Sequence, residues 1–204
     1  MNAPPAPRRP VWLSLMSSAM LVYAGMSLVD ALSLLRRPQA VTAGAIEDVA
    51  RATGQIEAAR RLSAISQAVV AAHPVAVRLE AGAAAVVALL TLFAVAAIFA
   101  RDGRARRATV AAGWVGIIYQ LGALPFAVAM ARQAADAGAP VLQQVLAQNG
   151  KEMPGLAPGD VTAALRAAVI MMPVLRAAMG IAWSLALLVF FAGRRGRAVF
   201  GPDS

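Results

Sequence analysis

Apolar residues gather along this chain in four long runs, with shorter polar or mixed segments between them. The runs extend from about Val11 to Leu35, Leu79 to Ala100, Ala108 to Ala131 and Ala167 to Gly193. A helix that crosses the hydrocarbon core of a bilayer needs about 20 mostly apolar residues, because each residue advances about 1.5 Å. The pattern therefore predicts an all-α polytopic membrane protein, a bundle of four transmembrane helices.

Composition supports a membrane protein over a soluble one. The chain is 60% hydrophobic and only 14% charged, whereas soluble proteins carry about 25% charged residues. A soluble domain of 204 residues has too little interior to bury that much apolar surface. The absence of cysteine excludes disulfides, thiolate metal sites and thiol catalysis.

The arginines predict the orientation of the four spans. They crowd the segments 1–10, 101–107 and 194–204, whereas the longer segments 36–78 and 132–166 carry nearly balanced charge. Short connections that are rich in arginine stay in the cytoplasm. We therefore expect two cytoplasmic tails, a cytoplasmic turn and two extracytoplasmic loops. The net charge of +9 then reflects topology, and we expect no nucleic-acid partner.

The two longer connections have different patterns. Residues 45–72 lack proline and place Glu57 four residues before Arg61, a spacing that stabilises helices, so we expect one or two helices there. In the second connection, Pro140 is expected to open a short helical turn, and several Pro-Gly and Asn-Gly pairs then predict turns. Asp160 or Thr162 is expected to cap the fourth helix.

The two halves of the chain resemble each other. Tyr23 precedes Arg36 by the same interval at which Tyr119 precedes Arg132. Proline, arginine and glycine also recur in order at the start of two runs, as Pro74, Arg78 and Gly82 and as Pro173, Arg176 and Gly180. Two repeated hairpins of the same topology would be related by an axis along the membrane normal. The alternative is chance similarity between alanine-rich apolar segments.

Four ionisable residues within or beside the runs are candidates for a ligand site or an ion pair: Asp30, Arg78, Glu80 and Arg176. At a rise of about 1.5 Å per residue, each lies about 27–33 Å from the cytoplasmic end of its own span. We therefore expect an Asp30–Arg176 pair, with Glu80 and Arg78 nearby, in a polar crevice at the outer end of the bundle. The alternatives are a structural ion pair and snorkelling of the side chains to the head groups.

Other residues suggest structure more than chemistry. Pro173, Pro125 and Pro74 are expected to kink their helices. His73 is the only histidine, so a metal site is not expected and a loop position is the simpler interpretation. Serines of the first run, including Ser17, are spaced for hydrogen bonds to the preceding helical turn or to a neighbouring helix. The glycines give only a weak signal for close helix packing.

No nucleophile–base set, phosphate loop or metalloprotease motif occurs in the sequence. We therefore expect a non-catalytic membrane protein without a cofactor. The first prediction is an accessory or assembly subunit, or a small sensor, whose extracytoplasmic loops contact another membrane or periplasmic protein. The alternative is a small transporter or a binder of lipid or another apolar ligand. The abundance of alanine, arginine and proline suggests a GC-rich bacterial genome and hence the inner membrane. The oligomeric state stays open.

Overall fold

The computed structural model describes residues 10–36, 56–100, 102–149 and 158–200, and these form helices joined by short connections. The helices are α1 (Val11–Arg36), α3 (Ile56–Ala72), α4 (Pro74–Ala100), α5 (Ala105–Asn149), α6 (Pro158–Ala192) and α7 (Arg194–Phe200). Four of them, α1, α4, α5 and α6, are long and apolar enough to cross a membrane. The prediction of an all-helical chain with four such helices is therefore confirmed for the described residues.

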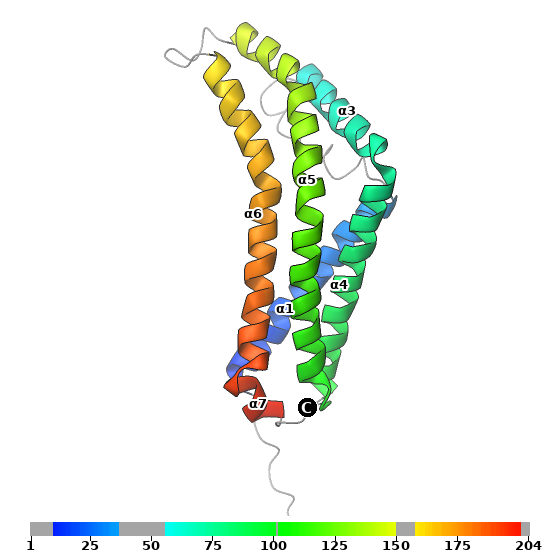
Figure 1. The fold of residues 1–204 in the computed structure, drawn as a ribbon, viewed down its shortest axis with the longest axis vertical. Helices are drawn as coiled ribbons and strands as arrows, with labels where there is room; N and C mark the ends of the chain where they lie inside the picture. Colours follow the sequence, from blue (N-terminus) through cyan, green and yellow to red (C-terminus); the bar gives the residue numbers. More distant parts are fainter. Residues whose placement is uncertain (1–9, 37–55, 101, 150–157, 201–204) are drawn as a thin grey trace, which may run out of the picture.

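The spanning helices form an open arc. Helices α4, α5 and α6 run along the long axis of the molecule, and α1 crosses behind them at an angle (Figure 1). Helix α1 packs against α4, α4 against α5, and α5 against α6. Within the described residues, no Cα atom of α1 lies within 8 Å of a Cα atom of α6. These two helices are the ends of the arc.

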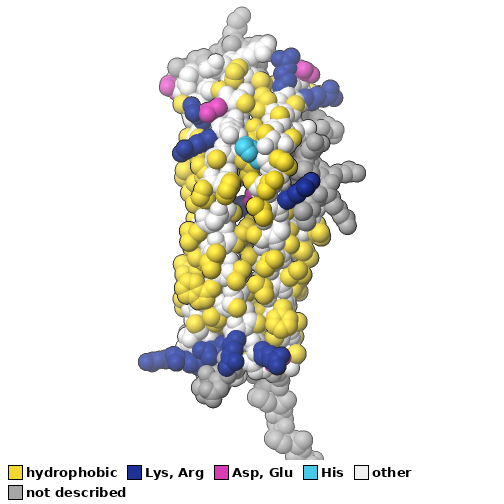
Figure 2. Space-filling view, turned by 45° about the vertical axis from the view of Figure 1, so that its right-hand side comes forward, with side chains coloured by type: hydrophobic (Ala, Val, Ile, Leu, Met, Phe, Trp, Pro, Cys, Tyr) yellow, Lys and Arg dark blue, Asp and Glu magenta, His cyan; other side chains and the backbone are white. Residues whose placement is uncertain are grey.

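The surface has a membrane-like pattern. On the face in Figure 2, arginine side chains gather at the lower end, a broad band of hydrophobic side chains follows, and both charge signs occur at the upper end. The described arginines of this lower end are Arg104 in the short turn between α4 and α5, Arg106 and Arg107 at the start of α5, and Arg194 and Arg197 of α7. We call it the arginine-rich end. This distribution indicates a multi-pass membrane protein.

Helix α5 is longer than the predicted third span. It continues past Ala131 and through Pro140 to Asn149. Residues 140–147 are therefore helical, as expected, but they continue α5 instead of opening a separate turn. The bounds 108–131 of the third span stay a prediction. Tertiary packing explains the difference, because α3 lies against this extension. A Cβ atom at the buried Gly138 would lie 3.1 Å from Leu62 Cδ2 of α3, so glycine permits this close approach.

The predicted helix in the first connection is present as α3, while residues 45–55 lie outside the described part of the chain. A one-residue interruption at His73 separates α3 from α4. Pro74 is the first residue of α4, where a missing N–H costs nothing because that N–H has no partner within the helix. Pro125 and Pro173 lie inside α5 and α6, and kinks at these two positions stay predictions.

Helix α6 begins earlier than the sequence suggests. Its first residue is Pro158, so Asp160 and Thr162, the two expected caps, both lie inside the helix. Asp160 stands in the first turn, where a negative charge interacts favourably with the helix dipole. The start of α6 is therefore stabilised by a proline and an acid in that turn instead of by an Asp or Thr cap.

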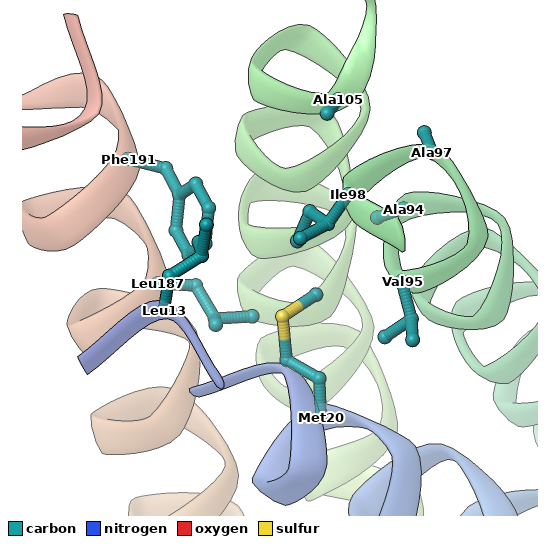
Figure 3. Close-up of a cluster of buried hydrophobic side chains, with 9 residues drawn as sticks. All are labelled: Leu13, Met20, Ala94, Val95, Ala97, Ile98, Ala105, Leu187 and Phe191. Carbon is teal, nitrogen blue, oxygen red and sulfur yellow. The ribbon is translucent and has the colours of Figure 1, made fainter. Parts of the chain in front are cut away.

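A core of buried hydrophobic side chains lies at the arginine-rich end. Its members come from all four spanning helices, and Met20, Ile98 and Leu187 point into the space between them (Figure 3); the full set is Leu13, Met20, Ala94, Val95, Ala97, Ile98, Ala105, Leu187 and Phe191. Trp12 of α1 adds aromatic contacts, with its ring centroid 6.1 Å from those of Phe190 and Phe191. Arg106 Nε of α5 donates a hydrogen bond of 3.1 Å to the carbonyl of Phe191, which satisfies a carbonyl group in the last turn of α6.

Hydroxyl groups inside the spans bond to their own helices. Ser17, Thr91 and Thr109 each donate a hydrogen bond of 2.8 Å to the carbonyl four residues earlier. Such bonds satisfy a buried hydroxyl where no water is at hand. For Ser17, the predicted bond to the preceding turn is confirmed.

Small residues bring α5 and α6 close together. A Cβ atom at Gly116 would lie 2.5 Å from Ser184 Oγ, and one at Gly180 would collide with the Gln120 side chain. Gly180 and Ser184 are one turn apart on α6, as in the small-residue pairs of other membrane helices. The weak glycine signal in the sequence thus corresponds to a close contact between α5 and α6. Glycine spacing alone does not predict it, because Ser184 acts as the second small residue of the pair with Gly180.

We expect Gly116→Ala to lower the free energy of unfolding by about 1–3 kcal/mol, because the added methyl group overpacks the contact with Ser184. Thermal unfolding in mild detergent measures the change, and Ser184→Gly in the same chain should restore stability. Gly122→Ala on the same helix is the matched control, since nothing lies within 4 Å of its Cβ position. Equal effects at Gly116 and Gly122 would contradict the close contact.

Candidate functional site

A large cavity lies between the two ends of the helical arc. It has a volume of about 670 Å³, within the range of about 300–1,000 Å³ that is usual for ligand pockets. We call it the α1/α6 cavity. Its lining comprises Ser18, Ala19, Val22, Tyr23, Met26 and Ser27 of α1, Ala84 and Val87 of α4, Tyr119 and Gln120 of α5, and Arg176, Met179, Gly180 and Trp183 of α6.

On the α6 side, an aromatic ring pair forms the floor of the cavity toward the arginine-rich end, whereas on α1 the lining continues past Tyr23 to Ala19 and Ser18. The rings of Tyr23 on α1 and Trp183 on α6 are 5.7 Å apart and bridge the gap between two helices whose backbones do not pack. Trp183 also packs against the core below. The buried indole N–H of Trp183 has no hydrogen-bond partner in the described structure, so ring packing and not hydrogen bonding holds this floor together.

A guanidinium group lies at one end of the cavity. Because α1 and α6 run in opposite directions, Ser27 and Arg176 both lie at the end away from the floor. Arg176 precedes Trp183 by a distance of about 10 Å along the helix, at a rise of about 1.5 Å per residue. Polar side chains line other levels of the cavity as well, since Ser18 lies toward the opposite end and Gln120 lies beside Gly180.

A second cavity lies between α4 and α5. It has a volume of about 580 Å³, and its lining includes His73, Leu79 and Glu80 together with Tyr119 and Phe126. Figure 2 shows a hollow on this face below the histidine, with an acidic side chain inside it. We call it the α4/α5 cavity. Tyr119 lines both cavities and is thus part of the wall that they share.

A pair of opposite charges accompanies this shared wall. Glu80 is half-buried and lines the α4/α5 cavity, whereas Arg176 lines the α1/α6 cavity. Burial dominates the environment of the Glu80 carboxyl group, and the positive charge of Arg176 adds an attraction across the shared wall.

The four residues of the predicted crevice are placed differently, and their grouping stays a prediction. Glu80 and Arg176 line two cavities that share Tyr119. Arg78 is exposed and lines neither cavity. Asp30 belongs to α1, but its side chain lies outside the described residues. The predicted pairing of Asp30 with Arg176 therefore stays a prediction.

Polar contacts tie the helices together beyond the cavities. Arg166 of α6 and Asp136 of α5 form a salt bridge of 2.6 Å. His73 Nε2 donates a hydrogen bond of 2.8 Å to Gln133 Oε1 of α5, so this histidine has a structural contact. In the described segments, no three His, Cys, Asp or Glu side chains cluster as a metal site requires. The contacts hold the helix ends that flank both cavities.

Several cavity residues were not identified from the sequence. Gln120 is an uncharged polar residue in mid-span, and such a residue signals an interior-facing position. Tyr23 and Tyr119 were noted only as marks of a repeat, yet both line the α1/α6 cavity.

Comparisons with known protein families, with curated proteins and with solved structures find no match to this chain. What the protein does is therefore inferred from its cavities and from the charged residues beside them.

We expect Glu80→Gln and Arg176→Gln to be energetically coupled. In a double-mutant cycle of unfolding in detergent, the coupling free energy should be about 0.5–3 kcal/mol, as for residues in direct electrostatic contact. A second cycle that combines Asp30→Asn with Arg176→Gln tests the predicted pairing of Asp30 with Arg176. Arg132→Gln with Glu80→Gln is the control, because Arg132 lines neither cavity and its effect should add to that of Glu80. Additive effects of Glu80 and Arg176 would rule out the pair.

Proposed function

We propose that this protein is a non-catalytic membrane protein that binds a lipid or another apolar ligand in the α1/α6 cavity. The observation that supports the proposal most is the position of the cavity, between two spanning helices whose backbones do not pack. In a bilayer, such a gap faces the hydrocarbon. A lipid chain can then enter sideways from the membrane without crossing a polar surface.

The lining supports an apolar ligand. Val22, Met26 and Met179 line the cavity, yet 62–68% of the surface of each is exposed. Long flexible methionine side chains adapt to ligands of different shapes. A bound acyl chain would cover these residues on the inside of the gap, while surrounding lipid covers the outer faces of the helices.

We further propose that the protein resides in a bacterial inner membrane with both chain ends in the cytoplasm. The arginines of the turn between α4 and α5 and of α7 support this orientation, because they share one end of the bundle. The Arg176 end of the α1/α6 cavity then belongs to the outer leaflet. This places Arg176 near the head groups of that leaflet.

An accessory role is the second proposal. Helix α3 lies outside the four spans, and its exposed side chains include Glu57, Arg60 and Arg61. Among its described residues, Ile56 is the large apolar side chain that stays exposed. The helix thus presents a mainly polar surface to a membrane or periplasmic partner, and an apolar docking patch on it receives less support.

We also propose that the hairpins α1–α4 and α5–α6 arose by duplication. Each hairpin is made of two helices that pack against each other, and the equivalent tyrosines Tyr23 and Tyr119 line the same cavity. A superposition of the two hairpins tests the proposal. Helix crossings of opposite hand would end it.

Ala19→Phe should reduce the amount of lipid that remains bound after purification in mild detergent, because the ring fills the cavity from α1. Quantitative mass spectrometry of the extracted lipid, per mole of protein, measures the effect, and we expect a loss of at least half, as for a ligand in direct steric conflict. Ala96→Phe is the matched control, since Ala96 is exposed on α4 but lines neither cavity. Equal lipid retention in both variants would contradict a site in this cavity.

A further inference from the structure

We infer that the α1/α6 cavity selects amphiphiles with an anionic head group, held by the Arg176 guanidinium, with the alkyl chain directed toward Tyr23 and Trp183. The inference rests on the proposed function, because it names the class of ligand that the same cavity takes. It adds a preference for charge and a direction of insertion, and neither follows from apolar binding alone.

The preference for charge comes from the lining. Among the described residues of the α1/α6 cavity, Arg176 is the only one that carries a formal charge at neutral pH, and it lies at one end. The same lining includes the hydroxyl of Ser27 and, beside Gly180, the side chain of Gln120, which supply further hydrogen-bonding groups. A guanidinium group binds carboxylates and phosphates through paired hydrogen bonds. A cationic head group at this end would meet a like charge.

The direction of insertion comes from the floor. Trp183 is the α6 lining residue farthest from Arg176, and Tyr23 packs against it, while apolar residues such as Val87 and Met179 line the wall. A head group at Arg176 therefore leaves a depth of about 10 Å for the chain, at the helical rise of about 1.5 Å per residue. A ligand in this pose has the same orientation as a lipid in the leaflet around it, so it can enter the gap without turning over.

Glu80 sets the strength of the preference. Its carboxylate attracts the Arg176 guanidinium but lines the α4/α5 cavity. It therefore competes with an anionic ligand for Arg176 without occupying the ligand's space. Removing the carboxylate should therefore strengthen binding, whereas removing the guanidinium should weaken it. A purely structural ion pair would not produce opposite effects on the affinity for a ligand.

Tryptophan fluorescence tests both the charge and the direction. In the full chain, Trp12→Phe and Trp114→Phe leave Trp183 as the single tryptophan. The probes are an alkyl carboxylate, an alkyl alcohol and an alkyl trimethylammonium salt, each brominated at the last carbon. Their chains have about eight to twelve carbons, to match the depth of about 10 Å along α6. A carboxylate brominated beside the head group serves as the comparison for direction.

We expect saturable quenching of Trp183 by the carboxylate with the terminal bromine, and much weaker quenching when the bromine is beside the head group. The carboxylate should bind about tenfold or more tightly than the alcohol or the cation, as for a hydrogen bond to a charged group. Arg176→Gln should remove that preference, and Arg176→Lys should retain part of it. Glu80→Gln should strengthen carboxylate binding by about twofold to fivefold, the range of a weak ion pair.

Different outcomes of this experiment would overturn the anionic preference and the proposed function. Arg132→Gln and Glu57→Gln change charges that line neither cavity and should leave all affinities unchanged. Equal binding of the three probes, or tightest binding of the cation, would overturn the anionic preference while leaving the proposed function in place. Absence of saturable quenching with every probe would overturn the proposed function itself. If Arg176→Gln does not fold, the relative affinities of the chain with Arg176 intact for the three probes still decide whether the cavity prefers an anionic head group.

Discussion

The backbones of α1 and α6 do not approach each other closely enough to pack, and the other features of the structure depend on how that gap is filled. At the arginine-rich end, rings such as Trp12 and Phe190 fill it, and a core made from all four spanning helices closes around them. Further along, Tyr23 and Trp183 also bridge it. From the level of Ser18 on α1 and Trp183 on α6 onward, the gap is a cavity, so one end of the bundle is closed and the other is open to a ligand.

The distribution of small residues over the helix faces explains which spanning helices pack closely and why α1 and α6 stay apart. Between helices in a bilayer there is little hydrophobic driving force, so close contact depends on residues that let backbones approach. Glycines and Ser184 provide this for α5 and α6, and buried alanines such as Ala24 and Ala81 lie in α1 and α4, which also pack together. The α1 and α6 faces that line the gap carry large side chains such as Tyr23, Met179 and Trp183 among smaller ones. The bundle is thus two close hairpins that meet through α4 and α5.

Much of this architecture was predictable, because the length of an apolar run and the placement of arginines are local properties. The four runs predicted four spanning helices, and the helical rise placed Glu80 and Arg176 at similar heights. The extension of α5 through Pro140 was not predictable, since its packing against α3 depends on tertiary contacts at Gly138. The cavity was not predictable either. Its existence depends on which helices are neighbours, and no local pattern encodes that α1 and α6 stay apart.

The central claim is that the α1/α6 gap is a ligand site and not a packing defect. An experimental density map of the protein in bilayer nanodiscs made with native lipids tests it most directly. The account predicts elongated density between α1 and α6, with its broader end beside Arg176 and its narrow end at Tyr23 and Trp183. A closed gap would contradict the account, with Cα atoms of α1 and α6 within 8 Å at the level of Met26 and Met179, where no such approach exists now.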